Sequence, residues 1–217
     1  MKKKMIIIFI FLVLVLTGFK SNLNPPFFPL SGMLIIVDPG HGGKDPGTLY
    51  NDIYEKDIVL KIATQLEKKL TLKGASVIMT RTGDYDLSKP NATSRKKSDF
   101  DNRIELINGS KANFYLSIHL NFLNQKQYFG GQVFYNKENK QLAQSIQLSF
   151  NEELNSNREI KLIPSTNYMY EKLNINGVLI ECGFLSNANE RNKLITSSYQ
   201  EEIANVIVTG LINYIYD

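Results

Sequence analysis

The stretch "MLIIVDPGHGGKDPG" (residues 33–47) joins an apolar run to a turn rich in glycine and proline. Residues 33–37 are all apolar, which is typical of a strand buried on both faces of a parallel sheet. The turn places four glycines and two prolines around His41, one of the two histidines in the chain. Glycine lets the backbone turn sharply and keeps bulk away from the imidazole. The stretch therefore predicts a buried strand that ends at a histidine accessible to an ion and a substrate.

Apolar runs and amphipathic segments alternate along the rest of the chain. Between Glu55 and Gly74 the apolar residues recur at helical spacing, and the glycine marks the end of the helix. Such alternation predicts an α/β fold, with a largely parallel sheet and helices on both faces. We further expect strands at 75–80, 113–119, 130–136 and 177–184, and helices around 104–111, 139–154 and 203–216.

The first 19 residues have the pattern of an export signal. Three lysines at positions 2–4 precede an apolar run from Met5 to Leu16. A helix over this region is about 22 Å long, shorter than the roughly 30 Å of a hydrocarbon core, which favours a signal peptide. An uncleaved anchor that contacts the membrane stays open, because no clear cleavage site or lipid-accepting cysteine follows. We assign 1–19 to a signal peptide or anchor, 20–32 to a linker and 33–217 to one catalytic domain.

Charge and cysteine content exclude several classes of protein. The net charge is +4, but four lysines lie within the first 20 residues, and the remaining 21 basic and 21 acidic residues balance. We therefore expect no nucleic-acid partner. The single cysteine, Cys182, excludes an internal disulfide, so core packing or a metal must stabilise the exported domain.

Both histidines follow predicted strands. His119, in "SIHLN", ends the strand 113–119 as His41 ends the first strand. Ligands of open α/β sheets collect at the carboxyl ends of the strands, so the two imidazoles are expected at one site. Two imidazoles, one carboxylate and a water form an open, catalytic zinc site. Glu55, at the start of a predicted helix, is the candidate carboxylate.

Other residues compete for these roles. Glu55 could instead complement the dipole of its helix. Asp38, Asp45 and Asp57 are rival metal ligands, and Asp38 could equally accept a hydrogen bond from a histidine N–H. A phosphate-binding loop is disfavoured, because "GHGGKDPG" matches neither common glycine-rich phosphate motif.

Glu181 follows three apolar residues in the predicted strand 177–184. An ionised carboxylate in a core strand costs several kcal/mol unless a cation or a hydrogen-bond partner compensates it. Beside a zinc ion it would serve as a general base and acid, with a pKa raised by its apolar surroundings. A structural salt bridge is the alternative. The neighbouring Cys182 could be a nucleophile or a ligand, but a single buried cysteine is more often a small core residue.

These motifs together resemble the zinc-dependent N-acetylmuramoyl-L-alanine amidases of the family 3 type, and the short spore-cortex and germination members most of all. The similar stretches are "IIVDPGHGGKDPG", "EKDIVLKIA", "VIMTRTGD", "SIHLN", "GGQVFY" and "VLIECGFLSN", which together span about 34–217. The resemblance implies a six-stranded, mostly parallel twisted sheet flanked by helices and one Zn²⁺. It implies that His41, Glu55 and His119 bind the metal and that Glu181 is catalytic.

The implied reaction is hydrolysis of the amide between the lactyl group of N-acetylmuramic acid and the first L-alanine of the peptidoglycan stem. Peptidoglycan is then the substrate, outside the membrane, and an activating protein partner is open. We expect Asn121 and Arg81 to contact the substrate and Asp38 to support the metal site.

Two positions depart from the family pattern, namely Asn176-Gly177 before the last strand and Leu120 after "SIH", and the loop 83–98 is a candidate rim. The alternatives are another zinc hydrolase of peptidoglycan, a carboxypeptidase or a deacetylase, or a non-catalytic wall-binding module.

Overall fold

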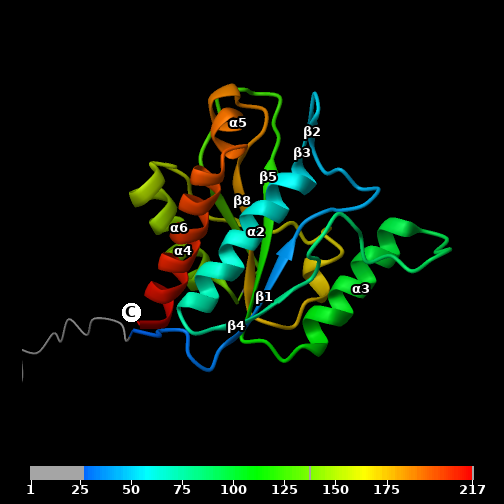
Figure 1. Cartoon of the computed structure of the whole chain (residues 1–217), viewed down its shortest axis with the longest axis horizontal. Helices are drawn as coiled ribbons and strands as arrows, with labels where there is room; N and C mark the ends of the chain where they lie inside the picture. Colours follow the sequence, from blue (N-terminus) through cyan, green and yellow to red (C-terminus); the bar gives the residue numbers. More distant parts are fainter. Residues whose placement is uncertain (1–26, 137, 217) are drawn as a thin grey trace, which may run out of the picture.

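The computed structural model describes residues 27–136 and 138–216, so the predicted signal segment 1–19 lies outside the described residues. Figure 1 shows a central sheet with helices on either side. The strands are β1 (Leu34–Pro39), β2 (Leu49–Tyr50), β3 (Ile53–Tyr54), β4 (Ser76–Met79), β5 (Phe114–Asn121), β6 (Gln132–Tyr135), β7 (Lys161–Leu162) and β8 (Gly177–Phe184). The helices are α2 (Glu55–Leu72), α3 (Arg95–Gly109), α4 (Lys140–Leu154), the 3₁₀ turn η1 (Tyr170–Lys172), α5 (Ala188–Leu194) and α6 (Ser197–Tyr216).

Six strands form one sheet in the order β4-β1-β5-β8-β6-β7, and β2 and β3 form a separate hairpin. Strands β4, β1, β5 and β8 are parallel to one another, whereas β6 is antiparallel to β8 and parallel to β7. The predicted α/β fold and the mostly parallel six-stranded sheet are confirmed. The parallel strands end at one edge of the sheet, where the turn after β1 and the end of β5 carry the two histidines.

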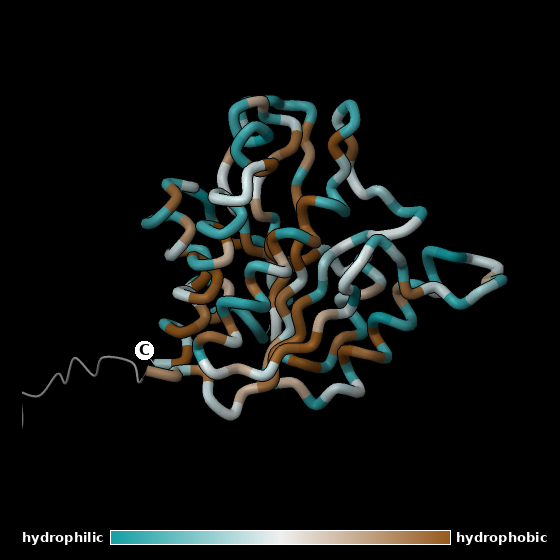
Figure 2. The backbone as a smooth tube through the Cα atoms, in the orientation of Figure 1, coloured by the Kyte–Doolittle hydropathy of each residue, from teal (hydrophilic) through white to brown (hydrophobic). Residues whose placement is uncertain are grey.

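Each face of the sheet has its own apolar core. Helices α2, α4 and α6 cover one face, where Val37, Ile118 and Ile180 are fully buried. Helix α3 and η1 cover the other, where Ile36 and Tyr115 are buried. In Figure 2 the most hydrophobic residues lie along the central strands and in the parts of the helices beside them. Because β1, β5 and β8 are covered on both faces, their near-continuous apolar sequences are explained.

Helix α2 positions the first residue of the site. Its apolar residues Ile58, Ile62, Leu66 and Leu70 lie on one face and are buried against the sheet. Burial of each such side chain contributes about 1.5–3 kcal/mol. The helix ends before Gly74, whose φ of +96° is of the kind that glycine adopts without strain. The predicted helix between Glu55 and Gly74 is therefore confirmed, and Glu55 begins it.

Several elements differ from the expectations. Helix α6 begins at Ser197 instead of Ile203. The prediction missed its first turn, because that turn is polar and has no apolar period. Helix α3 begins at Arg95, inside the segment 83–98 that we expected to be a loop. The hairpin β2–β3, strand β7, η1 and helix α5 were not anticipated, because elements of two to seven residues are too short to show a period.

The described part of the expected linker packs on the domain. Leu30 is fully buried in the core formed with α2, and its N–H donates to Lys73 O at 2.9 Å. Phe27 and Phe28 are exposed. Within the described ranges, no helix is both long and apolar enough to cross a membrane.

Candidate metal centre

Four elements bring their side chains together at the carboxyl edge of the sheet. His41 lies in the turn after β1, His119 near the end of β5, and Glu55 at the first position of α2. Glu181 lies on β8 directly beside His119 in the parallel register. Neighbouring residues in register point to the same face, so the carboxyl group of Glu181 lies on the His119 side of the sheet.

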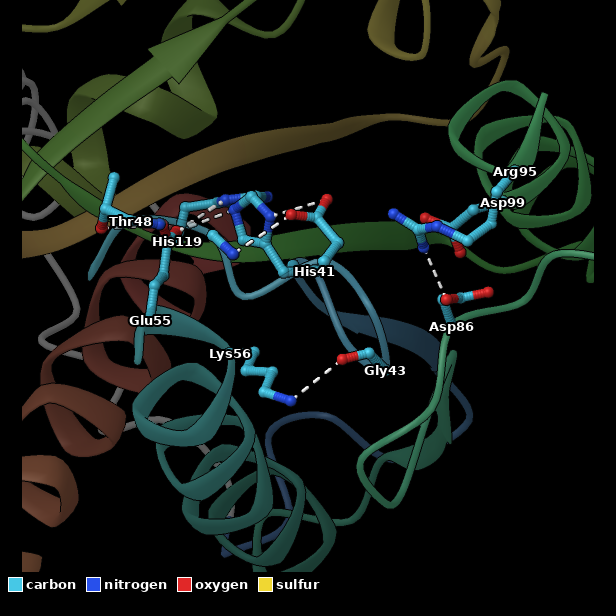
Figure 3. Close-up of polar contacts among 12 residues, drawn as sticks. His41, Gly43, Thr48, Glu55, Lys56, Asp86, Arg95, Asp99 and His119 are labelled. Carbon is cyan, nitrogen blue, oxygen red and sulfur yellow. Dashed lines mark hydrogen bonds and ion pairs between the residues drawn. The ribbon is translucent and has the colours of Figure 1, made fainter. Parts of the chain in front are cut away.

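Three of these residues form a compact ligand cluster. One ligand atom each of His41, Glu55 and His119 lie within 4.8 Å of one another. Glu55 Oε1 is 3.2 Å from His41 Nε2 and 3.0 Å from His119 Nδ1, and the two rings meet edge to face with centroids 4.9 Å apart (Figure 3). The rival carboxylates Asp38, Asp45 and Asp57 are not part of the cluster.

The Glu55 carboxylate is fixed on both oxygens. Its Oε1 accepts the Leu120 N–H at 2.9 Å, and its Oε2 accepts the Thr48 N–H at 2.8 Å and the Thr48 hydroxyl at 3.0 Å. Burial opposes ionisation of this group, which is 1% exposed, but the contacts with His119 and His41 outweigh it and hold the pKa of Glu55 well below its usual range. The site thus holds an ionised carboxylate between two imidazoles.

His41 is held from its other side by Asp45. Its Nδ1 is 3.1 Å from Asp45 Oδ2, which leaves Nε2 facing Glu55. Burial lowers the pKa of His41, but the contacts with Asp45 and Glu55 outweigh burial and raise the pKa to about 9. A carboxylate on one ring nitrogen fixes the tautomer and orientation of a histidine whose other nitrogen binds a metal. Asp45 therefore serves as a partner of His41 and not as a member of the cluster.

Two arginines hold the backbone of the turn that carries His41. Arg103 donates to His41 O at 2.6 Å and to Pro39 O at 2.9 Å. Arg81 donates to Pro39 O at 3.1 Å and to Gly40 O at 2.8 Å. Arg81 is only 1% exposed, so the predicted contact of Arg81 with substrate has almost no accessible surface in this conformation.

Asp38 is a buried partner of Arg103. Its Oδ1 accepts from Arg103 Nη1 and from the Thr80 hydroxyl, both at 2.6 Å, and its Oδ2 accepts from the Ser117 hydroxyl at 2.8 Å. Burial opposes its ionisation, but Arg103 and the two hydroxyls lower the pKa of Asp38. Its hydrogen bonds within the described residues go to these groups instead of a histidine ring. Asp38 thus supports His41 through Arg103, not through the predicted histidine N–H.

Two glycines leave room for the ligands. A Cβ on Gly40 would lie 2.2 Å from His119 Cε1, and one on Gly47 would lie 2.6 Å from Glu55 Oε2. Gly47 also has φ +68°, a conformation that disfavours other residues. The expected role of the glycines is confirmed, and it extends to Glu55 and His119 as well as His41.

Glu181 lies beside the cluster with one unsatisfied oxygen. Its Oε2 is buried and has no hydrogen-bond partner among the described residues. Burial raises the pKa of Glu181 to about 8, with a further increase from the Glu55 charge and an opposing effect of His41. Cys182, the next residue, belongs to the core on the opposite face, so it does not face the cluster.

The remaining site residues lie around the rim. Asn121 is half-buried at the end of β5; its backbone O accepts from Leu185 N at 2.9 Å, and its predicted substrate contact stays a prediction. The expected rim segment 83–98 reaches the turn through Asp84, which accepts from Gly43 N at 2.8 Å and from Lys56 Nζ at 2.7 Å. Lys56 also donates to Gly43 O at 3.0 Å (Figure 3). Sequence reasoning missed Thr48 and Arg103, because polar residues in a loop or on a helix carry no signal of such distant contacts.

Known proteins are similar to this chain in sequence and fold. A family model described as N-acetylmuramoyl-L-alanine amidase matches residues 35–213. The chain is 39% identical to the germination-specific N-acetylmuramoyl-L-alanine amidase of Bacillus subtilis over 203 residues, 90% of this chain and 85% of that one. It is 32% identical to the probable cell wall amidase LytH of Staphylococcus aureus, over 84% of this chain and 58% of the relative. The solved CwlD amidase from Clostridioides difficile, in complex with the GerS lipoprotein, superposes with a TM-score of 0.80 at 40% identity and covers 85% of this chain and 98% of its own.

Proposed function

The chain belongs to the N-acetylmuramoyl-L-alanine amidase family, and we propose that it cleaves peptidoglycan with one zinc ion held by His41, Glu55 and His119. The amidase reaction is hydrolysis of the amide between the lactyl group of N-acetylmuramic acid and L-alanine. The identity of the ion and the roles of the individual residues are the content of the proposal.

The donor set of the cluster fits zinc. Two imidazole nitrogens and one carboxylate oxygen are the ligands of open, catalytic zinc sites, which keep a further position for water or substrate. Asp45 on His41 supplies the carboxylate partner that metal-binding histidines require, and Thr48 and Leu120 fix Glu55. The clearance at Gly40 and Gly47 lets the three donors approach one another.

When bound, zinc supplies Lewis acidity that polarises the scissile carbonyl and lowers the pKa of the attacking water. Glu181 receives the proton of that water on its carboxylate and delivers it to the leaving nitrogen of L-alanine. A raised pKa suits a group that must both take and return a proton near neutral pH. The observation that carries this role is Oε2 of Glu181, which is buried beside the cluster without a partner in the described ranges 27–136 and 138–216.

We further propose that the enzyme acts on the spore cortex. The support is its similarity to a germination-specific amidase, which covers most of both chains. The relative solved with the GerS lipoprotein supports a protein partner for this chain as well. Export through residues 1–19, with 20–32 as the linker to the catalytic domain 33–217, would bring the enzyme to its substrate outside the membrane, and an uncleaved leader would add membrane contact.

A muropeptide digest tests the proposal. We expect wild type with zinc to release peptides with new L-alanine amino termini and a chelator to abolish the reaction. Glu181→Gln should keep zinc and lose about 10²–10⁴-fold in turnover, because proton transfer is lost while the ligands are intact. Glu152→Gln, on the exposed side of α4, is the matched control. A fully active Glu181→Gln variant would remove this residue from the mechanism, and release of D-alanine or acetate would indicate a different hydrolase.

A further inference from the structure

A small cavity lies at the same edge of the sheet as the ligand cluster. Its volume is about 260 Å³, and its walls come from the hairpin β2–β3, the loop after β5 and the segment from β8 into α5. Figure 1 shows these three segments together beyond the carboxyl ends of β5 and β8. The lining side chains used below are Tyr50, Lys126, Ser186, Asn187 and Arg191.

Each wall continues directly from an element that carries a residue of the proposed site. Tyr50 precedes Glu55 by five residues, Lys126 follows His119 by seven, and Ser186 follows Glu181 by five. Since a chain advances at most about 3.5 Å per residue, five to seven residues hold the cavity walls within about 25 Å of the site residues. The cavity therefore lies at the same edge of the sheet as the site.

The cavity is lined by cations and hydrogen-bond donors. Arg191 lies over the Tyr50 ring, with its guanidinium carbon 3.5 Å from the ring centroid. Within the part of the chain that the structure describes, Arg191 donates one hydrogen bond, from Nη1 to Leu185 O at 2.8 Å. Since a guanidinium has five N–H donors in a planar fork, donors are left for a ligand. Lys126 adds a second, exposed cation, and no acidic residue lines the cavity.

Asn187 adds a further donor for an anion. Its Oδ1 is occupied, because it accepts the N–H groups of Asn189 and Glu190 at 2.9 and 3.1 Å. Its amide nitrogen therefore faces away from these contacts as a donor. Two cations and an amide donor, with aromatic support for one cation, form a site that selects a carboxylate over a neutral group.

We propose that this cavity binds the free α-carboxylate of the second residue of the stem peptide and so sets the peptide preference of the enzyme. The proposal rests on the amidase function above, in which the stem leaves the scissile bond through L-alanine. An extended peptide advances about 3.4 Å per residue, so this carboxylate lies only about 7–10 Å from the scissile amide. It is the first free carboxylate beyond L-alanine, and Arg191 and Lys126 are the cations that this cavity offers it.

Paired substrates test the proposal. Two N-acetylmuramoyl tetrapeptides are compared, one with D-glutamate and one with D-isoglutamine at the second position, which differ only in this carboxylate. We expect the wild type to cleave the acid with a higher kcat/KM. Lys126→Gln should lower kcat/KM for the acid about three- to fivefold, the range of a partly exposed ion pair, and leave the amide unchanged. Lys61→Gln, on the exposed side of α2, is the matched control and should change neither.

Arg191→Gln extends the test to the buried cation. We expect a loss of about tenfold or more on the acid, and a smaller loss on the amide, because the stack with Tyr50 also holds the hairpin. Equal losses on both substrates in both variants would give the cavity a structural role and overturn the proposal. Equal wild-type kcat/KM for the two substrates would overturn the proposed carboxylate site and leave the amidase function intact. Cleavage of neither substrate would refute the amidase function itself.

Discussion

Glu181→Gln should stabilise the metal-free protein, and increasingly so as the pH rises. Without a cation, the partly buried Glu181 has one buried carboxylate oxygen, Oε2, with no partner among the described residues. Burial raises its pKa to about 8, above the 4.5 of an exposed glutamate. The folded state therefore binds this proton more tightly than the unfolded state. The contribution of Glu181 to the free energy of unfolding thus decreases as the pH rises from about 4.5 to about 8 and is constant above. Glutamine has a similar shape and no charge to lose.

The magnitude follows from the separation of the two pKa values. One pKa unit corresponds to about 1.36 kcal/mol, so the full difference is at most about 5 kcal/mol. The same relation gives a penalty of about 1 kcal/mol at pH 5 and about 3 kcal/mol at pH 7. The stability difference between Glu181→Gln and wild type should thus grow by several kcal/mol across this range.

Urea unfolding of chelator-treated protein at pH 5, 7 and 8.5 measures this difference. His41 also has a raised pKa, so the stability of both proteins should decline as its proton is lost toward pH 9, and the subtraction largely removes that contribution. Glu152→Gln is again the exposed control and should give a difference near zero at every pH. A Glu181→Gln difference that does not change with pH would refute the claim that the burial of Glu181 Oε2 is uncompensated.

Three further changes address the support of the cluster. Asp45→Asn should lower zinc affinity about 10–100-fold in competition with a chromophoric chelator, because the carboxylate that orients His41 is lost; unchanged affinity would contradict this role. Gly40→Ala should abolish stoichiometric zinc binding, measured by metal analysis after dialysis, because the new Cβ would lie 2.2 Å from His119 Cε1. Arg103→Met should lower the free energy of unfolding by about 3–5 kcal/mol in chemical denaturation, because it leaves Asp38 and Asp99 buried without their cation, and a loss below about 1 kcal/mol would argue against this buried network.

The sequence predicts best those elements whose bounds are set by their own apolar pattern and not by contacts with distant residues. Strand β8 has the predicted bounds 177–184, because a strand buried on both faces is a nearly continuous apolar run, interrupted here by Glu181. Helix α6 is six residues longer than its apolar pattern, because the packing of its later turns extends the helix into a polar first turn. The two-residue strands β2 and β3 have no pattern of their own, so the hairpin could be found only from its contacts with Thr48, Glu55 and Arg191.

The site shows a similar division. The edge of a parallel sheet brings His41 and His119 together once the strands are known, so their proximity follows from the sequence. The residue pattern alone could not choose Glu55 over Asp45, because the choice depends on how α2 begins relative to the turn. Asp38 was expected to accept from a histidine N–H and Arg81 to contact the substrate, and both are buried. The partner of Asp38 is Arg103, 65 residues away, and no local pattern joins the two.

The segment from Thr48 to Glu55 links the proposed metal site to the proposed peptide subsite. Thr48 fixes one oxygen of Glu55, and Tyr50 lies against Arg191 at the cavity. Thr48 directly precedes the hairpin β2–β3 and Tyr50 is part of it, and the last residue of the hairpin directly precedes the helix that begins with Glu55. Any movement of this hairpin should therefore shift the proposed metal ligand and the proposed peptide contact together. This coupling offers a physical route by which a correctly bound stem peptide would improve the geometry of the catalytic centre, so changes in the hairpin should affect kcat as well as KM.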